Sequence, residues 1–148
     1  MSEDYGKKVK FRIPLDIDWA VPEWMQCPVD GYRHIEFELR HADDEKCDEL
    51  RAMATEVTFD NRKRVESINE DLYVTELFKY GLVKWRGADG ECTDEAKLNF
   101  MRRHRKAATW AMTLISDGIE IAKVKMERLE AEKKISATGC GPDSITQS

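Results

Sequence analysis

Apolar and polar residues alternate at two places near the start of the chain. From Val9 to Ile17, in "VKFRIPLDI", every second residue is apolar, and the stretch "GYRHIEFELRH", residues 31–41, repeats the pattern. A period of two predicts half-buried strands. We therefore expect two strands that pair as an antiparallel hairpin. The long segment "WAVPEWMQCPVDG" would connect them, and Pro14 indicates an edge position or a strand end.

The hydrophobic period becomes helical after His41. The stretch "ADDEKCDELRAMA" begins with acidic residues, which suit a helix N-terminus, and places Cys47, Leu50 and Ala54 on one face. A second helix is predicted from about Asn61 to Tyr80. Its apolar positions are Val65, Ile68, Leu72, Tyr73, Leu77 and Tyr80.

Gly81 follows directly, where a helix C-terminus favours a residue that can adopt positive φ. We expect "LVKW" to be a short extended segment whose apolar side chains reach the core, with Trp85 packed inward. The dipeptide Asp89–Gly90 predicts a turn. Thr93 or Asp94 would then cap the next helix, which includes Leu98 and Met101.

The most regular helical pattern runs from about Arg105 to Lys134. Its apolar residues are alternately four and three positions apart, which is a heptad seam. A glycine inside a helix is unfavourable, so a bend or break is expected at Asp117–Gly118. The seam could pack inside its own domain, or it could associate with a second copy or another helix. Its members are Ala108, Met112, Ile115, Ile119, Ala122, Met126 and Leu129.

These patterns together predict an α+β fold. A small N-terminal antiparallel β hairpin would be followed by a mainly helical body of four or five helices, with a long C-terminal helix. We expect a flexible N-terminus at residues 1–8, a single domain at 9–134, and a disordered, turn-rich tail at 135–148.

The composition narrows the class of protein. The 148 residues are 41% apolar and 36% charged, with a net charge of −5, which is typical of a soluble globular protein and disfavours nucleic acid as the main partner. No apolar run approaches the roughly 20 residues of a membrane span. The N-terminus lacks the apolar segment of a signal peptide. A cytoplasmic location is expected.

Few residues are candidates for chemistry. The four cysteines, Cys27, Cys47, Cys92 and Cys140, show no CxxC spacing, so neither a zinc site nor a disulfide framework is predicted. His34, Glu36 and Glu38 share one face of the second strand, and we interpret them as a solvated strand face in preference to a metal or acid–base site. The basic clusters "NRKR" and "MRRHRK" are expected to be solvated helix faces. We predict no catalytic residue, metal or cofactor.

Several segments, in order, resemble the tail assembly chaperones of long-tailed bacteriophages. They are "VKFRIPLDID", "IEFELRHADDEKCDEL" and "LVKWRGADGE", within a resemblance that covers about Val9 to Ile115. The turn in the third segment is shorter than in the family, "ECTDEA" replaces a more apolar stretch, and the helix after Gly118 has no counterpart. The recurring block of the family falls here on Leu82, Val83, Trp85, Gly87, Asp89 and Gly90.

The resemblance implies a non-enzymatic protein of the host cytoplasm that is absent from the mature virion. Such chaperones bind the tape measure protein, a long helical chain, and keep it soluble while the tail tube assembles. A structural tail or connector protein retained in the virion is the alternative. The residues expected to contact the client or a second copy are Met112, Ile115, Ile119, Ala122, Met126 and Leu129.

The family often makes a longer product by a −1 frameshift, which adds a domain that recruits tail tube protein. Two lysine codons can form a slippery run, and Lys133–Lys134 lie where the helical pattern ends. A lysine pair is also common at a helix C-terminus, where it complements the macrodipole. Both interpretations remain open from the sequence.

Overall fold

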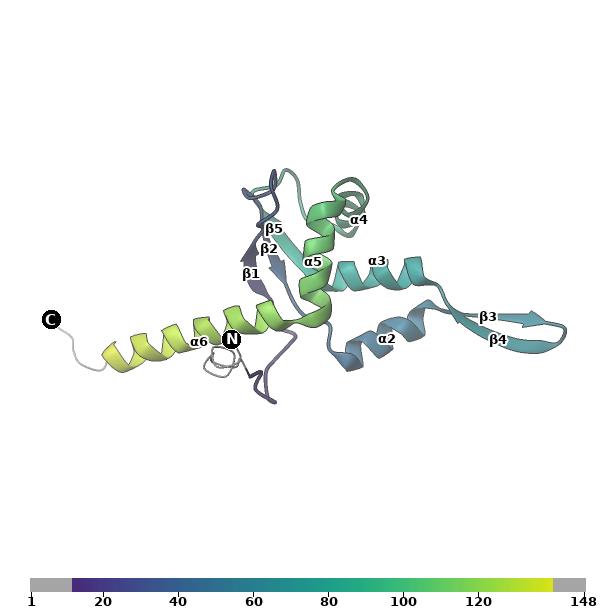
Figure 1. The fold of residues 1–148 in the computed structure, drawn as a ribbon, viewed down its shortest axis with the longest axis horizontal. Coiled ribbons are helices and arrows are strands. Elements are labelled where there is room, and N and C mark those ends of the chain that lie inside the picture. The colour runs from purple at the N-terminus through teal and green to yellow at the C-terminus, as the bar shows by residue number, and fades with distance from the viewer. Residues whose placement is uncertain (1–11, 140–148) are drawn as a thin grey trace, which may run out of the picture. The chain divides into compact units, whose positions relative to one another are not determined.

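The computed structural model describes residues 12–139, which form a mixed helical and β structure, as the sequence predicts (Figure 1). One compact unit is Trp19–Ile121, and residues from both ends of the chain form a second. The predicted flexible N-terminus (1–8) and residues 140–148 of the predicted tail lie outside the described residues. The elements, in order, are β1 (Glu23–Gln26), β2 (Glu36–Leu39), α2 (Asp44–Ala54), β3 (Thr55–Asp60), β4 (Lys63–Ile68), α3 (Glu70–Gly81), β5 (Leu82–Arg86), α4 (Asp94–Arg103), α5 (Arg105–Asp117) and α6 (Ile119–Gly139).

The main sheet has three antiparallel strands in the order β1-β2-β5. Its central strand, β2, buries Phe37 and Leu39 on one face, as the alternation predicts, and directs Glu36 and Glu38 to the other. Phe37 packs against the ring of Trp110 on α5, with 6.0 Å between the ring centroids. The apolar face of the sheet therefore lies against the helical body, and the opposite face carries charges.

The N-terminal hairpin is present, but its first strand is not the predicted one. The described part of the segment Val9 to Ile17 forms a turn, in which the Ile17 amide donates to the Pro14 carbonyl at 3.3 Å. Pro14 has no amide to give to a sheet, which favours a turn over a central strand. The first strand is β1, a four-residue run between Pro22 and Pro28 that had been expected to be a loop.

Helix α2 begins where its acidic residues predict. The Asp43 carboxylate accepts a hydrogen bond from the Lys46 amide at 2.9 Å, which satisfies one of the free amides of the first turn. Leu50 and Ala54 are buried, as expected, and Cys47 is half-buried. The helix packs beside α3 in the helical body.

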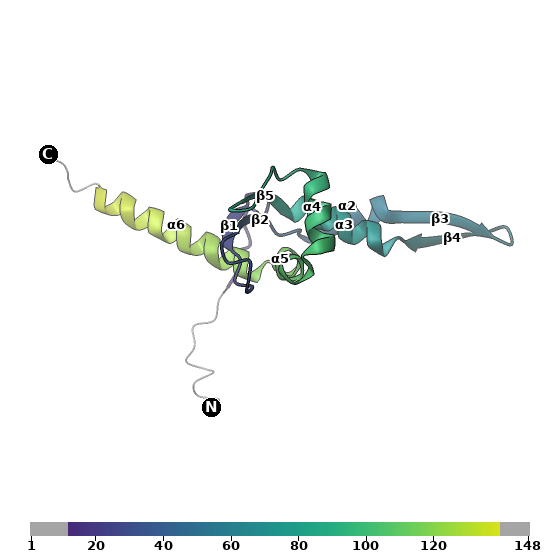
Figure 2. The ribbon, with the colours of Figure 1, turned by 90° about the horizontal axis from the view of Figure 1, so that it is seen from above.

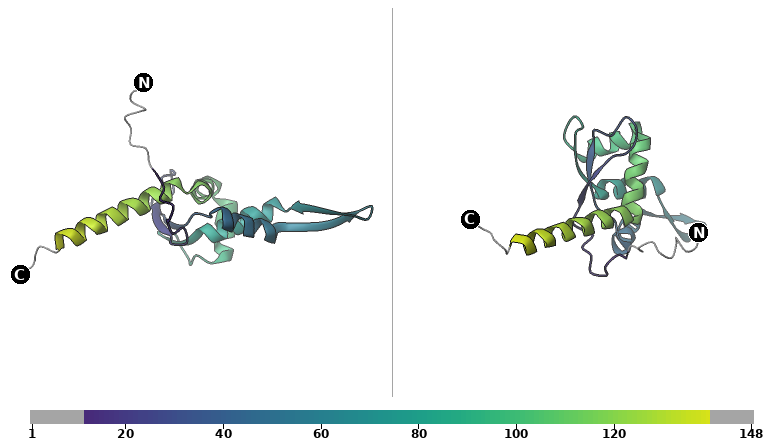
Figure 3. Two further views of the ribbon diagram at one scale, coloured as in Figure 1. Left: turned by 90° about the horizontal axis from the view of Figure 1, so that it is seen from below. Right: turned by 60° about the vertical axis from the view of Figure 1, so that its left-hand side comes forward.

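The predicted helix from Asn61 to Tyr80 is wrong in its first half. Residues 55–68 form a β hairpin, which we call the arm, and α3 starts only at Glu70. Asn61 and Arg62 both have positive φ, 52° and 69°, which is the backbone of a two-residue type I′ turn. The arm extends beyond the ends of α2 and α3, with no other described element beside it (Figure 3).

Gly81 ends α3 as expected, but not for the expected reason. It does not have positive φ, since it is the last helical residue and β5 begins at the next position. A Cβ at Gly81 would overlap the side chain of Ile115 on α5. The glycine is therefore needed for the close approach of α5 to α3, and "LVKW" is the strand β5, as predicted.

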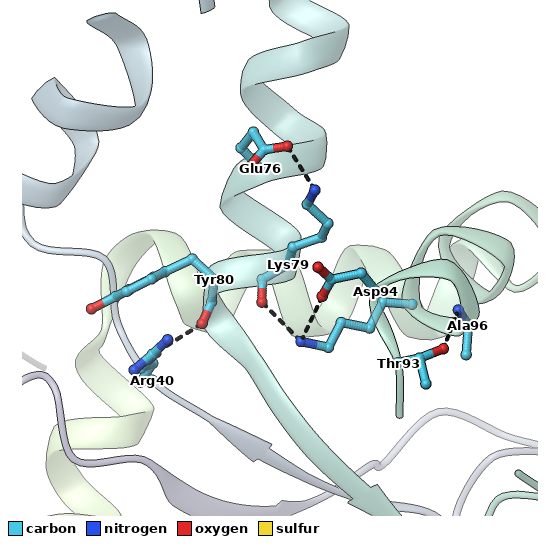
Figure 4. A network of polar contacts seen from close by, with 8 residues as sticks. Arg40, Glu76, Lys79, Tyr80, Thr93, Asp94 and Ala96 are labelled. Atoms are coloured by element: carbon cyan, nitrogen blue, oxygen red, sulfur yellow. Dashed lines mark hydrogen bonds and ion pairs between the residues drawn. The ribbon is translucent and has the colours of Figure 1, made fainter. Parts of the chain in front are cut away.

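The last carbonyls of α3 have partners from outside the helix (Figure 4). The Lys97 ammonium donates to the Lys79 carbonyl at 3.0 Å, and the Arg40 guanidinium donates to the Tyr80 carbonyl at 2.8 Å. The Arg40 amide donates to the Gly81 carbonyl at 2.9 Å. Carbonyls at the end of a helix have no partners within it, so these contacts join α3 to β2 and α4.

Helices α4 and α5 follow each other closely. Thr93 caps α4, as one of the two predicted residues, by accepting from the Ala96 amide at 3.1 Å. Figure 2, in which α5 is viewed nearly along its axis, shows α3 and α4 together on one side of it.

Gly118 confirms the expected break. It has φ +71° and ends α5, and α6 then begins at Ile119. Helix α6 is the predicted long C-terminal helix, and it continues to Gly139, past the predicted end at Lys134. Lys133–Lys134 therefore lie inside α6 and not at its end.

We expect Gly81→Ala to lower the stability of the protein, although alanine favours a helix by about 1 kcal/mol. Overpacking against the buried Ile115 side chain costs typically 1–3 kcal/mol. The measurement is urea unfolding of Gly81→Ala, Ile115→Val and the double variant. Because the shorter valine leaves room, the double variant should be more stable than the sum of the two single effects predicts. Strict additivity would contradict this contact.

Candidate partner-binding groove

An open groove of about 760 Å³ lies among α3, α4 and α5. Its floor and walls combine apolar side chains with short polar ones. The lining residues are Asp71 and Val74 from α3, Met101 and Arg102 from α4, and Arg105, Ala108, Thr109, Met112, Thr113, Ser116 and Asp117 from α5.

Helix α5 supplies most of the residues that line the groove. One face of this helix is buried in the core, and the neighbouring face is accessible. The buried face carries Ala111, Leu114 and Ile115, which pack into the core. The neighbouring face presents Met112, which is half-buried, and the exposed Thr109. The core contacts fix the helix, and the groove face remains accessible.

The apolar part of the groove is partly exposed. The Val74 side chain on α3 is 38% exposed, and Met101 and Met112 are half-buried. Methionine side chains are flexible and polarisable, so they adapt to differently shaped apolar partners. The rim is mixed in charge, with two acidic side chains (Asp71, Asp117) and two basic ones (Arg102, Arg105).

The predicted seam is divided between α5 and α6, and its residues differ in how far they are exposed. Ile115 is fully buried and contacts α3 at Gly81, so it cannot contact a partner. Met112 lines the groove. Ile119 and Leu129 are 44% and 45% exposed on α6, where Met126 is half-buried. Ala122 is fully buried, so it is not available to a partner either.

A second cleft, of about 740 Å³, contains much of the block that carries the resemblance. Trp85, Gly87 and Asp89 line it, together with aromatic residues that include Tyr32 and His104. The Tyr32 hydroxyl and the His104 Nδ1 are 3.0 Å apart.

Trp85 is half-buried and not wholly inward. Its ring packs against Phe100, with 5.7 Å between the centroids, and its indole N–H donates to the Gly90 carbonyl at 3.0 Å. Gly87 has φ +85°, and a Cβ there would overlap the His34 carbonyl oxygen. The block thus comprises most of β5 and the turn that follows it, and the hydrogen bond from Trp85 to Gly90 joins the two.

The other candidate residues of the sequence do not meet in one site. Glu36 accepts from the Arg86 guanidinium at 2.5 Å, and Glu38 lies opposite Lys84 in the sheet. Within residues 12–139, no group of three or more histidine, cysteine or acidic side chains could hold a metal ion. The basic cluster "NRKR" forms the tip of the arm, and "MRRHRK" spans the joint between α4 and α5.

Two cysteine thiols have a shifted pKa, and burial is the main cause in both. Burial raises the pKa of both Cys27 and Cys92, so these side chains are neutral thiols at neutral pH. Neither of them lines the groove.

The chain matches no family model, and no curated protein or solved structure is significantly similar to it. Between residues 12 and 139, no helix is both long enough and apolar enough to span a bilayer.

Sequence reasoning found Met112 but missed the rest of the groove. Val74, Met101 and Thr109 come from three helices, and no local period relates them. A signal for the arm was available. In "TEVTFDNRKRVESI", β-branched residues lie on both sides of an asparagine that can adopt positive φ, and an aromatic residue precedes it.

Proposed function

We propose that this protein is a non-enzymatic tail assembly chaperone of a long-tailed bacteriophage. Its client would be the tape measure protein, which it would keep soluble in the host cytoplasm while tail tube subunits assemble. The resemblance of the segments around Trp85 supports this function. The observation that carries it is the open groove of α3, α4 and α5, whose lining includes Met112.

The groove suits an amphipathic helix as its occupant. Recognition of this kind places the apolar stripe of a helix in an apolar groove, and polar groups at the rim contact its flanks. Val74, Met101 and Met112 supply the apolar contacts, and charges of both signs surround them. Such a rim accepts helices whose flanking charges vary, as they would along a long client.

Weak individual contacts are sufficient for this role. A long helical client offers many similar segments, so many chaperone molecules can coat it at once. Binding that is weak at each site also allows the chaperones to leave as tube subunits polymerise. A longer form that recruits tail tube protein would fit the same scheme through effective concentration.

The first test replaces Met112 by aspartate. Burying a methionine side chain contributes about 1.5–3 kcal/mol, so Met112→Asp should weaken client binding roughly ten- to hundredfold. The readout is the soluble fraction of coexpressed tape measure protein. Met53→Asp is the matched control, since it adds the same charge at a methionine that is 59% exposed on α2, outside the groove.

Circular dichroism of both variants separates lost binding from lost folding. Client solubility that is the same with folded Met112→Asp as with Met53→Asp would contradict a role for this groove.

The second test distinguishes the chaperone from a structural tail or connector protein. A chaperone leaves when the tube closes around the client, so peptides of this chain should be absent from purified virions and present in the lysate of infected cells. Quantitative mass spectrometry measures both, with the tail tube protein as the internal reference. A fixed ratio of this chain to tube protein in intact particles would favour the structural role.

A further inference from the structure

The arm is fixed to the protein at its base, where Thr55 donates to the Arg51 carbonyl and Glu56 accepts from Asn69, and it is exposed beyond that base. Apart from Thr55, which is half-buried, every residue of β3 and β4 is exposed. A two-stranded hairpin alone is at best marginally stable in water, and it becomes stable when more strands extend the sheet. The side chain of Phe59 is 72% exposed.

The pairing register assigns each residue to a face. Val57 lies opposite Glu66, Thr58 opposite Val65, and Phe59 opposite Arg64. Directly opposed residues share a face. One face therefore carries Thr55, Val57, Phe59, Arg64, Glu66 and Ile68, and the other carries Glu56, Thr58, Asp60, Lys63, Val65 and Ser67.

The register also shows which backbone groups point outward. A two-residue turn closes on a hydrogen-bonded pair, here Asp60 and Lys63, and hydrogen-bonded and non-bonded pairs then alternate along the hairpin. Along β4, the N–H and C=O groups of Arg64 and Glu66 point away from β3. They form an open sheet edge, which favours pairing with another strand.

We propose that the arms of two copies of this chain pair through their β4 strands, antiparallel, about a two-fold axis at Val65. In this register Arg64 of each copy lies opposite Glu66 of the other, so the outward backbone groups and the charges are both matched. The adjacent registers would place Arg64 opposite Arg64, or Glu66 opposite Glu66. Charge complementarity therefore selects one register, and the result is a four-stranded sheet.

The β3 edge has no register that opposite charges would select, because its charged residues, Glu56 and Asp60, are both acidic. The symmetric pairing that places Val57 opposite Phe59 of a second copy has its axis at Thr58. It also places Glu56 opposite Asp60 twice, and like charges in direct opposition are destabilising. The β4 edge has no such pair. The proposal does not depend on the client groove, because the arm contributes no residue to it.

Cross-linking tests the position of the axis. Val65 would face Val65 of the other copy in a non-hydrogen-bonded pair, whose Cα atoms are about 4.5 Å apart, close enough for a disulfide. Val65→Cys should therefore form a covalent dimer when oxidised with oxidised glutathione. Thr58→Cys is the matched control on the same face of the arm, and the wild-type chain gives the background from its own cysteines.

Charge reversal tests the register. Arg64→Glu alone and Glu66→Arg alone each place two like-charged pairs in the interface, so each variant should be monomeric in sedimentation. The Arg64 guanidinium also pairs with the Glu66 carboxylate of its own chain. An equimolar mixture of the two variants restores both pairs between chains and leaves none within a chain. The mixture should therefore sediment at up to twice the monomer mass of 17.2 kDa, as the wild type should with increasing concentration.

Three results would overturn the proposal: a wild-type chain that stays monomeric at all concentrations, a mixture that stays monomeric, or cross-linking of Thr58→Cys in place of Val65→Cys. Circular dichroism of each variant shows whether it is folded. Because the mixture is built from the same two single variants, its recovery of dimers cannot result from a loss of structure.

Discussion

The fold depends on the hydrogen bonds that the last carbonyl groups of α3 accept from other elements. The helix runs into β5 without a loop, so its last carbonyls have no partner from a following turn. Lys97 and Arg40 supply those partners, from α4 and from the end of β2. The same few residues thus join the sheet, α3 and α4, and Gly81 lets Ile115 of α5 approach at that point. An unsatisfied buried carbonyl would cost about 1–3 kcal/mol.

This junction explains why a groove forms among the helices. Helices α3 and α5 meet closely at Gly81 and Ile115, whereas Val74, two turns earlier on α3, is partly exposed. Met101 and Met112 occupy the space between the helices without filling it. An apolar, adaptable surface is thereby held on rigid helices, which suits a protein that binds many segments of a long helical client.

Local signals were enough to predict β2, the start of α2, the Thr93 cap and the break at Gly118, because each depends on neighbouring residues. The prediction of the first strand was wrong because it followed the alternation of apolar and polar residues, although Pro14 disfavours a paired strand. Val65 and Ile68 are three residues apart, a spacing that places them on one face of a helix but on opposite faces of a strand, so the arm was missed. The spacing within α5 could not show that Ile115 is buried and Met112 accessible, since that difference comes from the contact with Gly81.

The proposed function requires the groove that Met112 lines to bind a helical client. The most direct measurement is NMR of the protein labelled at its six methionine methyl groups, titrated with a helical peptide of the tape measure protein. Binding in the groove should shift the Met101 and Met112 signals with saturation and leave the Met53 signal unchanged. Saturable binding that shifts Met53 and leaves Met101 and Met112 unchanged would contradict it.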